Sequence, residues 1–386
     1  MTQNFKMYAQ RSKNVIYDIL EVFVNLFPVN IKKNTLLIIK LYGIGDYILW
    51  RNSLPYLVYS QKFKNYEITL LGNDIWKDLC DGLDTKYIKI SIWQNDFLFK
   101  RNLIYRFKLL YKIRKMGFEV VVNANMYRNK RVDDAFVRVC TKSFKVGSTS
   151  DKSNVLPFEY GYDKNLYDKL INTNVVDFEF YKNLLFTEQL IDKQLLNRIK
   201  LTVSTNSKLD EMLANLKYFV VFVGSSHRFK RWPIENFVSV CNYIFDKYNY
   251  TVVVCGGSSE KKSADEFLRL YSHPYINFCA KKDLIELAEI LKNAKFLLSV
   301  DTGAVHVAAA VSCPVFGIFN GSVYGRYAPY PPCVFLNFYA IYPDKIEADI
   351  NRTNMQQYKE QNIYIPYSSV TVKKVIKSIE KNFIEK

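Results

Sequence analysis

Four loops hold the residues best suited to chemistry, and each joins a predicted strand to a predicted helix. The clearest lies in residues 299–319, SVDTGAVHVAAAVSCPVFGIF, where an apolar strand leads into Asp301-Thr302-Gly303 and a small-residue helix carries His306 one turn in. A helix N-terminus offers free backbone N–H groups and a positive dipole end. This loop therefore suits a phosphate or sugar hydroxyls. The alternative is that Asp301 serves only as the helix N-cap.

A second loop, VGSSHRFKRWP in residues 223–233, crowds three cations and two hydroxyls ahead of a predicted helix. Cations near a helix N-terminus oppose the helix dipole, so a purely structural role is strained. An anion held between the helix start and Lys230, with Ser225 and Ser226 beside it, resolves that conflict. We therefore predict a phosphate site here, and the alternative is a solvated basic loop.

Two further loops pair glycines with a carboxylate. In YGIGD, residues 42–46, the glycines permit a tight turn and Asp46 begins a helix. In CGGSSE, residues 255–260, Glu260 follows a glycine turn, and an ionised carboxylate can accept both hydroxyls of a ribose. Each carboxylate has a structural alternative, because an acid at a helix N-terminus also caps the helix or complements its dipole. No third glycine completes a dinucleotide-binding fingerprint.

Composition limits the classes of function. The chain has 386 residues, enough for two or three domains, and a net charge of +17, which indicates an anionic partner unless it reflects compositional drift alone. Its seven cysteines form no C-x-x-C pair and it has three histidines, so we expect neither a disulfide framework nor a metal centre. We find no signal peptide and no run long enough to cross a membrane, and expect a cytoplasmic protein.

Strand and helix patterns alternate along both halves of the chain. Continuous apolar strands followed by helices are typical of parallel, doubly wound sheets with both faces covered. We therefore predict an α/β fold of two Rossmann-like domains with an inter-domain cleft: an N-terminal domain over residues 1–186, a linker at 187–217 and a C-terminal domain over 218–386. Residues 14–27 form an amphipathic helix within an N-terminal extension, 1–33, which packs on the first domain or lies on a membrane.

A basic stretch spans residues 100–115, within a segment that has no acidic residue from 97 to 118. On a helix, Arg101, Lys108, Lys112 and Lys115 share one stripe. Opposite this stripe lie the apolar residues Leu103, Phe107 and Leu110. We expect the apolar face to pack and the cationic face to meet an anionic membrane surface, the alternative being an ordinary solvated face.

The ordered set of loops resembles glycosyltransferase family 9, the ADP-heptose:lipopolysaccharide heptosyltransferases. The motifs are LIIKLYGIGDYILWRNSLP, VGSSHRFKRWP, VVVCGGSSE and SVDTGAVHVAAAVSCPVFGIF, and the resemblance extends from residue 36 to about 329, with a closing helix near 371–383. It implies the GT-B fold, with the acceptor bound by the N-terminal domain and the nucleotide-sugar by the C-terminal domain. Two features depart from the family: Tyr42 replaces the usual serines, and the N-terminal extension is atypical.

The resemblance also assigns roles to residues. It implies that Asp46 is the catalytic base and that Lys230 contacts the donor diphosphate, with the sugar moved with inversion and without metal or cofactor. The remaining donor-binding residues that it implies are Ser225, Ser226, Glu260, Asp301, Thr302, Gly303 and His306. The implied partners are a nucleotide-sugar, with ADP-heptose as the donor that the resemblance favours, and a lipopolysaccharide-core or related glycolipid acceptor reached from the inner face of the cytoplasmic membrane. We expect no nucleic-acid partner.

Two other functions stay open at this point. One is a nucleotide-sugar epimerase or hydrolase on the same scaffold, which would consume donor without acceptor. The other is a non-catalytic basic protein that binds membrane or nucleic acid, which would need neither Asp46 nor Glu260. The acceptor, the linkage position, the base of the donor nucleotide and the oligomeric state do not follow from the sequence.

Overall fold

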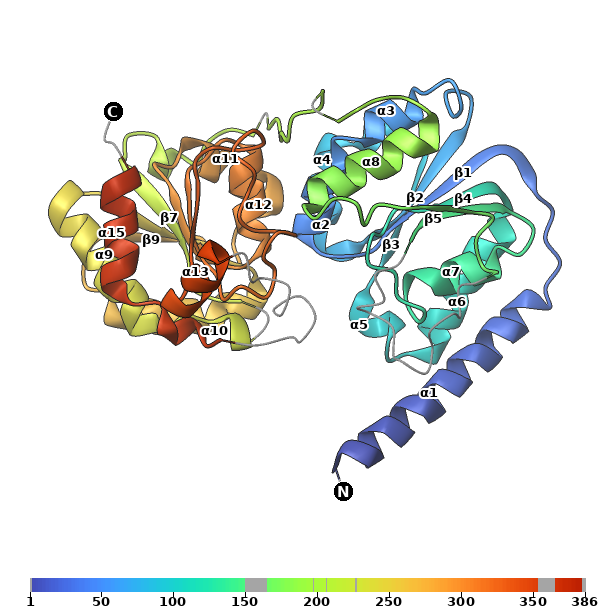
Figure 1. Ribbon diagram of the computed structural model, residues 1–386, viewed down its shortest axis with the longest axis horizontal. Helices are drawn as coiled ribbons and strands as arrows, with labels where there is room; N and C mark the ends of the chain where they lie inside the picture. Colours follow the sequence, from blue (N-terminus) through green and yellow to red (C-terminus); the bar gives the residue numbers. More distant parts are fainter. Residues whose placement is uncertain are drawn as a thin grey trace. The chain divides into compact units, whose positions relative to one another are not determined.

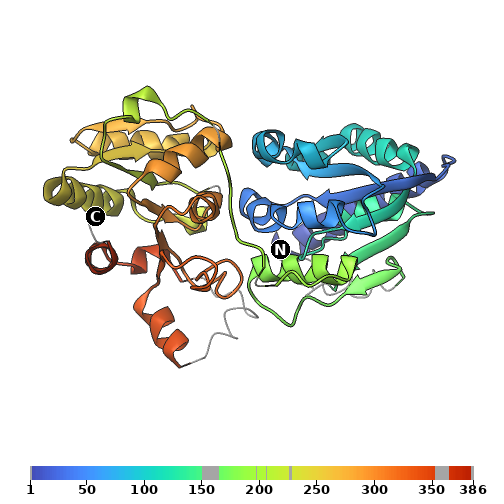
Figure 2. The same cartoon turned by 90° about the horizontal axis from the view of Figure 1, so that it is seen from above.

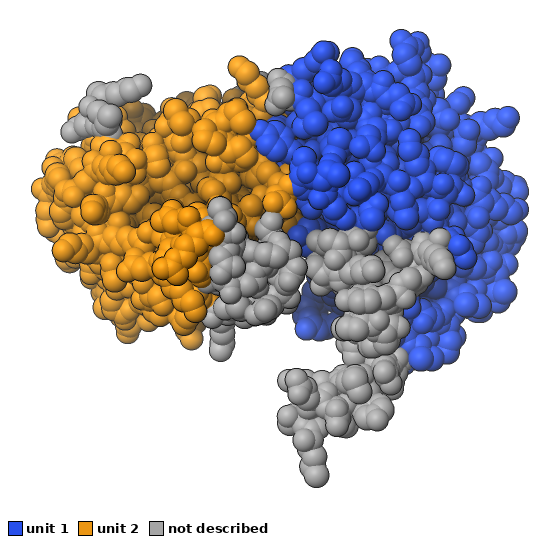
Figure 3. Space-filling model, viewed as in Figure 1, with its two compact units in different colours: residues 1–43, 53–176, 180–199 blue, residues 44–52, 177–179, 200–386 orange. Residues whose placement is uncertain are grey.

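Two parallel β-sheets, each in its own compact unit, form the framework of the protein (Figure 1). The computed structural model describes residues 2–149, 165–196, 198–205, 207–225, 228–352 and 365–383. Figure 3 shows the two units in different colours. Unit 1 consists of residues 1–43, 53–176 and 180–199. Unit 2 consists of residues 44–52, 177–179 and 200–386. The predicted domain limits at 186 and 218 stay a prediction.

The sheet of unit 1 has the strand order β3-β2-β1-β4-β5-β6, and every neighbouring pair is parallel. Its strands are β1 (Lys32–Lys40), β2 (Glu67–Asn73), β3 (Ile90–Gln94), β4 (Phe118–Asn123), β5 (Phe144–Ser148) and β6 (Lys169–Ile171). Central strand β1 is apolar and buried over residues 36–39, because helices cover both faces of the sheet.

The helices of unit 1 flank this sheet. They are α1 (Thr2–Asn25), α3 (Leu54–Val58), α4 (Lys77–Leu83), α5 (Asp96–Phe99), α6 (Leu103–Met116), α7 (Asp133–Val139) and α8 (Glu179–Ile191), whose first residue is grouped with unit 2. Figure 1 shows α3, α4 and α8 on one face of the sheet and α6 and α7 on the other. Helix α1 packs on α6 and α7.

Unit 2 repeats the architecture. Its strands are β7 (Tyr218–Phe222), β8 (Thr251–Val254), β9 (Tyr275–Asn277), β10 (Leu297–Val300), β11 (Val315–Ile318) and β12 (Phe338–Ile341), in the parallel order β12-β11-β10-β7-β8-β9. Its helices are α2 (Ile44–Arg51), α9 (Ile234–Tyr248), α10 (Lys261–Leu270), α11 (Leu284–Asn293), α12 (Gly303–Ala310), α13 (Asp344–Asn351) and α15 (Val372–Asn382). Figure 2 gives a second view of both sheets.

The predicted α/β class of two doubly wound sheets is confirmed. Counted from its first strand, each sheet has the order 3-2-1-4-5-6, so the order reverses between β1 and β4 in unit 1 and between β7 and β10 in unit 2. In open parallel sheets, ligands bind beyond the carboxyl ends of the strands at such a reversal. The loops after β7 and β10 are the ones that carry Lys230 and Asp301.

Two predicted helices are each divided in the structure. The helix predicted to begin at Asp46 is divided into α2 and α3, because Pro55 at the start of α3 has no N–H with which to continue the helix from α2. The helix predicted for the basic stretch 100–115 is interrupted between α5 and α6, because the side chain of Asn102 accepts the N–H of Tyr105 and starts a new helix. At its other end, α6 stops at Gly117, whose φ of 67° is left-handed.

The structure shows which faces of α1 and α6 are buried. Helix α1 packs on α6 and α7, which is one of the two alternatives expected for it, and Ile16, Ile19 and Phe23 are exposed. On α6 the predicted cationic stripe is exposed and Leu110 is buried, whereas Leu103, expected on the packed face, is 43% exposed.

A buried polar cluster lies beyond the carboxyl ends of β1 and β4 in unit 1. Asp133 accepts hydrogen bonds from the Tyr42 hydroxyl, the Asn129 N–H and the Asn123 amide, and the neighbouring Asp134 pairs with the buried Arg128. Burial, together with the charge of Asp134, raises the pKa of Asp133 to about 7 despite these donors. The native state therefore binds this proton more tightly than the unfolded chain does.

The substitution Asp133→Asn should flatten the pH dependence of stability. Since the carboxyl pKa is raised on folding, its protonation stabilises the native state at low pH, and that contribution is lost as the pH rises from the ordinary 3.8 through about 7. Thermal unfolding across this window should show wild-type stability falling more steeply with pH than that of Asp133→Asn. Asp78→Asn, at an exposed acid in the first turn of α4, should keep the wild-type slope. Equal slopes for wild type and Asp133→Asn would contradict the raised pKa.

Candidate active site

An ion pair joins two of the predicted loops at the point where the strand order of unit 2 reverses. Lys230 follows β7 and Asp301 follows β10, and the Lys230 Nζ lies 2.5 Å from the Asp301 Oδ2. Both side chains are largely buried, at 20% and 7% exposure. Asp301 is not the N-cap of α12: that position is Thr302, which makes no capping hydrogen bond with its side chain. The anion that we expected beside Lys230 is, in this structure, a carboxylate of the chain itself.

Asp46 lies in the first turn of α2, which the contacts group with unit 2. Its Oδ1 accepts a hydrogen bond of 2.6 Å from the Tyr327 hydroxyl, and the Arg326 Nη2 lies 3.9 Å from the same oxygen. Arg326 is held in turn by Glu179, with 3.0 Å between Nε and Oε2, and its carbonyl accepts the N–H of Glu179. The carboxylate is thus fixed in orientation by a hydroxyl and faces a cation.

His306, on α12, lies among these charged groups. Burial lowers its pKa to about 4, while the carboxylates of Asp301 and Asp46 oppose that shift and Lys230 adds to it. The imidazole is therefore neutral at neutral pH, and its Nδ1 lies 2.7 Å from the Tyr330 hydroxyl. The pairing of Lys230 with Asp301 and the contact of Gly45, the residue before Asp46, with the His306 ring place these groups together in unit 2.

Close packing of α2 on α12 brings this site together. A Cβ built on Gly45 would lie 2.4 Å from the His306 Cδ2, and one built on Gly303 would lie 2.9 Å from the Ile44 Cβ. These distances leave no room for a side chain at either glycine. Gly303 therefore has a packing role at the start of α12, beside any role toward a ligand.

Glu260 closes the turn after β8. Its Oε2 accepts the Gly257 N–H at 2.9 Å and its Oε1 accepts the Ser259 hydroxyl at 2.5 Å. A Cβ on Gly224, after β7, would lie 2.7 Å from the Glu260 Cγ, so Glu260 reaches the loop that leads to Lys230. The structural alternative for Glu260, capping of a helix N-terminus, is thus realised, and its contact with a ribose stays a prediction.

The remaining predicted residues are placed as follows. The side chain of Ser225 is buried, and its carbonyl accepts two hydrogen bonds from Arg231, each of 3.1 Å. The Thr302 hydroxyl lies 3.2 Å from that of Ser299. Ser226 lies outside the described residues.

Sequence reasoning missed the groups that hold Asp46, namely Tyr327, Arg326 and Glu179. The first two lie in the loop after β11, which ends at the same edge of the sheet as β7 and β10, so their place in the chain was an available signal. Glu179 had none, because the start of α8 is far from this loop in sequence. Tyr330, the partner of His306, comes from the loop after β11 as well.

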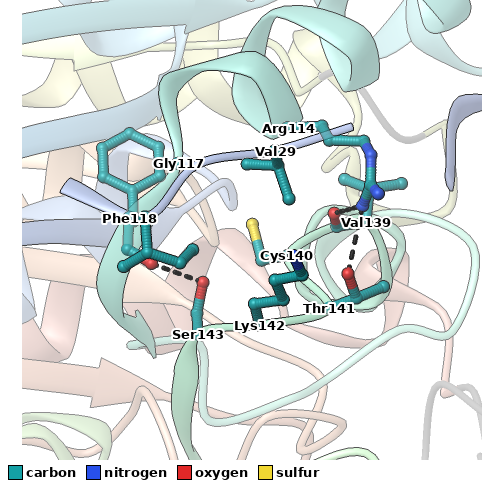
Figure 4. Close-up of a pocket in the computed structure, with 10 residues that line it drawn as sticks. Val29, Arg114, Gly117, Phe118, Val139, Cys140, Thr141, Lys142 and Ser143 are labelled. Atoms are coloured by element: carbon teal, nitrogen blue, oxygen red, sulfur yellow. Dashed lines mark hydrogen bonds between the residues drawn. The ribbon is translucent and has the colours of Figure 1, made fainter. Parts of the chain in front are cut away.

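A recess in unit 1 is a poorer candidate (Figure 4). Its guanidinium, Arg114, is occupied by the Val139 carbonyl and the Thr141 hydroxyl, and by Asn25 and Phe27 at the end of α1. Burial raises the pKa of the Cys140 thiol to about 12, so it is not a nucleophile at neutral pH. The recess thus belongs to the packing of the chain.

The residues that the structure describes include neither a metal-ligand cluster nor a membrane-spanning helix. Within the described ranges, no three His, Cys, Asp or Glu side chains are grouped so as to hold a metal ion. Of the helices in the part of the chain that the structure describes, none combines the length and the apolar content needed to span a membrane.

Comparison with known proteins places the chain. The model of glycosyltransferase family 9 (heptosyltransferase) matches residues 106–352. Lipopolysaccharide heptosyltransferase 3 of Escherichia coli K12 is 25% identical over 150 residues, 38% of this chain and 44% of that protein, so the match spans less than half of that relative. This chain belongs to glycosyltransferase family 9, as the motifs predicted.

Solved structures agree on the fold. A family 9 glycosyl transferase from Veillonella parvula has a TM-score of 0.63 at 18% identity, with 92% of this chain and all of that one covered. Escherichia coli heptosyltransferase WaaC with ADP has a TM-score of 0.62 at 14% identity, with 90% and 99% covered. The predicted GT-B fold is thereby confirmed.

The substitution Gly45→Ala should destabilise the protein. Its methyl group would meet the His306 ring, which is buried and held by Tyr330, and overpacking of this kind typically costs about 1–3 kcal/mol. Thermal unfolding should show a lower midpoint. Gly82→Ala, at an exposed glycine of α4, is the matched control and should leave the midpoint unchanged or slightly raised, because alanine favours a helix. If both variants behave alike, the contact between α2 and α12 is looser than described.

Proposed function

We propose that this protein is an inverting glycosyltransferase that moves heptose from ADP-heptose to a lipopolysaccharide core or a related glycolipid. The observation that carries the proposal is the grouping of Asp46, Lys230, Asp301 and His306 around one site in a member of family 9. The choice of sugar and acceptor is supported by the relative named a lipopolysaccharide heptosyltransferase, and the choice of nucleotide by ADP in the WaaC structure.

In the proposed reaction an acceptor hydroxyl attacks the anomeric carbon of the donor sugar. The new carbon–oxygen bond forms as the bond to the diphosphate breaks, and the hydroxyl proton passes to the carboxylate of Asp46. Tyr327 and Arg326 orient that carboxylate. One displacement inverts the anomeric centre, so a single base is sufficient and no covalent intermediate is required.

Donor binding is assigned to the loops of unit 2. Lys230 contacts the diphosphate and stabilises the charge that develops as it leaves, which removes the need for a metal ion or other cofactor. Glu260 holds the ribose, and Asp301, Thr302, Gly303 and neutral His306 line the phosphate and sugar pocket with Ser225 and Ser226. Lys230 is paired with Asp301. A diphosphate that binds Lys230 must therefore either replace the Asp301 carboxylate as its partner or share Lys230 with that carboxylate.

The proposed place of action is the inner face of the cytoplasmic membrane, with the enzyme bound peripherally. A lipid-linked acceptor is confined to a membrane, and the net charge of +17 favours an anionic surface. The partners are therefore the nucleotide-sugar, the glycolipid acceptor and the membrane.

A thermal-shift screen tests the donor directly. ADP-, GDP- and UDP-sugars are added to the whole chain, and the ligand that binds the native state raises the unfolding midpoint. We expect the largest shift with ADP-heptose. Donor turnover without any acceptor would favour an epimerase or hydrolase instead, and the absence of a shift with every nucleotide-sugar would favour a non-catalytic protein.

The substitution Asp46→Asn should remove most of the turnover and leave donor affinity nearly unchanged. The amide keeps an oxygen that can accept from Tyr327 but cannot take a proton, and general-base assistance is typically worth ~10²–10⁴ in rate. Rates are measured with saturating donor, and affinity by calorimetry. Asp78→Asn, which removes an acid from the first turn of α4, should retain full activity. A folded Asp46→Asn enzyme of wild-type rate would rule out the assignment.

The substitution Lys230→Ala should weaken donor binding and also reduce turnover. Loss of a charged hydrogen bond costs on the order of 1.5–3 kcal/mol, and the missing charge matters more as the diphosphate departs. Calorimetric titration with donor and with free nucleoside diphosphate measures the affinity, after circular dichroism has verified folding. Lys282→Ala is the matched control, since Lys282 is also ion-paired and 19% exposed, and it should bind donor normally. Equal affinities for the two variants would make Lys230 a purely structural cation.

A further inference from the structure

Helix α1 buries two polar side chains against unit 1 and leaves a row of apolar side chains exposed. Its side chains are described from residue 14 onward, and those buried against unit 1 are Asn14, Tyr17, Glu21 and Val24. The six most exposed between 14 and 26 are all apolar: Val15 56%, Ile16 46%, Ile19 63%, Val22 62%, Phe23 51% and Leu26 73%. At 3.6 residues per turn they lie within an arc of roughly 120°. We refer to these six residues as the apolar ridge.

The contacts on the buried side fix the direction in which the ridge points. Glu21 accepts hydrogen bonds from Arg106 at 2.9 Å and from Arg138 at 2.6 Å, and the Tyr17 hydroxyl donates to the Lys100 carbonyl at 2.6 Å. At the end of the helix, Arg114 binds two backbone carbonyls. Turning α1 to bury the ridge would leave these charged groups unpaired inside unit 1, which is costly. The outward ridge is therefore a stable feature of the fold.

Cations accompany the ridge along its length. Tyr17 contacts the start of α6 and Phe27 contacts Tyr111 and Arg114 near its end, so α1 and α6 run side by side in the same direction. The exposed cations there are Lys108, Lys112 and Lys115 on α6 and Arg101 just before it. More exposed apolar area adjoins them, from Phe97 at 60% and Ile104 at 68%.

We propose that the apolar ridge of α1 and the cations of α6 together form a surface that binds anionic phospholipid membranes. A helix of this kind lies in the plane of the interface, with its apolar side among the acyl chains and its cations at the headgroups. A contiguous exposed apolar patch is uncommon on a soluble monomer and marks an interaction surface. The surface rests on the peripheral membrane binding given under the proposed function and assigns residues to it, none of which takes part in the transfer reaction.

Charge decides between a membrane and a second copy of the chain. Two copies joined through their ridges would bring two rows of α6 cations together, in a protein whose net charge is already +17. An anionic bilayer instead meets both parts of the surface with complementary chemistry. The attraction of the cations is screened by salt, whereas the insertion of the ridge is not, and this difference is measurable.

Co-sedimentation of the whole chain with vesicles tests the proposal. The probes are vesicles of phosphatidylcholine with phosphatidylglycerol and vesicles of phosphatidylcholine alone, each at low and high salt. We expect binding to the anionic vesicles, weakened by salt. Ile19→Gln with Val22→Gln should lower the affinity by about tenfold or more, because two apolar side chains no longer enter the bilayer. Both positions are exposed, so circular dichroism should show an unchanged fold.

Matched variants separate the two parts of the surface. Lys108, Lys112 and Lys115 changed together to Gln should lower affinity at low salt and remove most of its salt dependence. The controls are Leu336→Gln, at another exposed apolar residue, and Gln at Lys89, Lys208 and Lys261, which are exposed cations elsewhere. Both controls should bind as wild type does, and all variants should bind the donor normally.

Three results would overturn the proposal. The first is a wild-type protein that ignores anionic vesicles at low salt, and the second is binding that the ridge and cation variants leave unchanged. The third is sedimentation equilibrium showing a wild-type dimer that Ile19→Gln with Val22→Gln converts to a monomer. Failure of the proposed transfer reaction is distinguishable, because it would leave vesicle binding intact and abolish donor binding.

Discussion

The packing of α2 against α12 is the constraint on which the candidate site depends. Two helices approach closely only where small residues face the partner, and here Gly45 faces His306 while Gly303 faces Ile44. Asp46 follows Gly45 directly, so the contact that admits the His306 ring also delivers the carboxylate to Tyr327. The packing of α2 on α12 thus explains why both Gly45 and Gly303 are glycines, apart from any need to approach a ligand.

Charge compensation is the second organising feature of this site. A buried carboxylate or ammonium group is costly unless it is paired, and each charged group here has a partner: Lys230 for Asp301, and Arg326 for Glu179 and, at a longer distance, Asp46. The site is therefore organised without ligand. His306 is neutral for a different reason: burial lowers its pKa to about 4, although the carboxylates of Asp301 and Asp46 oppose that shift.

Unit 1 uses its charges differently. Arg106, Arg114 and Arg138 are drawn inward to Glu21 and to the carbonyls at the end of α1, so they hold a helix and are not available to the surface. The remaining cations of α6 stay exposed beside the apolar ridge. The basic stretch of α6 thus has two roles. Residues on its inner side hold α1 in place, and residues on its outer side give the neighbouring surface its positive charge.

The sequence by itself determined the class of fold, the order of the elements and the family. Continuous apolar strands alternating with helices require parallel sheets with both faces covered. The sequence of a single strand such as β1 or β10 is enough to show this pattern. The same holds for Asp301 and Lys230: each follows a strand, and neighbouring parallel strands end at one edge. Their meeting could therefore be anticipated, although their direct pairing could not.

Only the tertiary structure decided which groups meet across long distances in the chain. Glu179, at the start of α8, reaches Arg326 although no spacing rule connects the two. Helix α2 joins the contacts of unit 2 although β1, just before it, belongs to unit 1. Periodicity predicted an amphipathic helix over residues 14–27 but did not show what its apolar side contacts. The burial of Glu21 with two arginines fixes which face of α1 is inside, because pairing a charge inside unit 1 outweighs covering an aliphatic side chain.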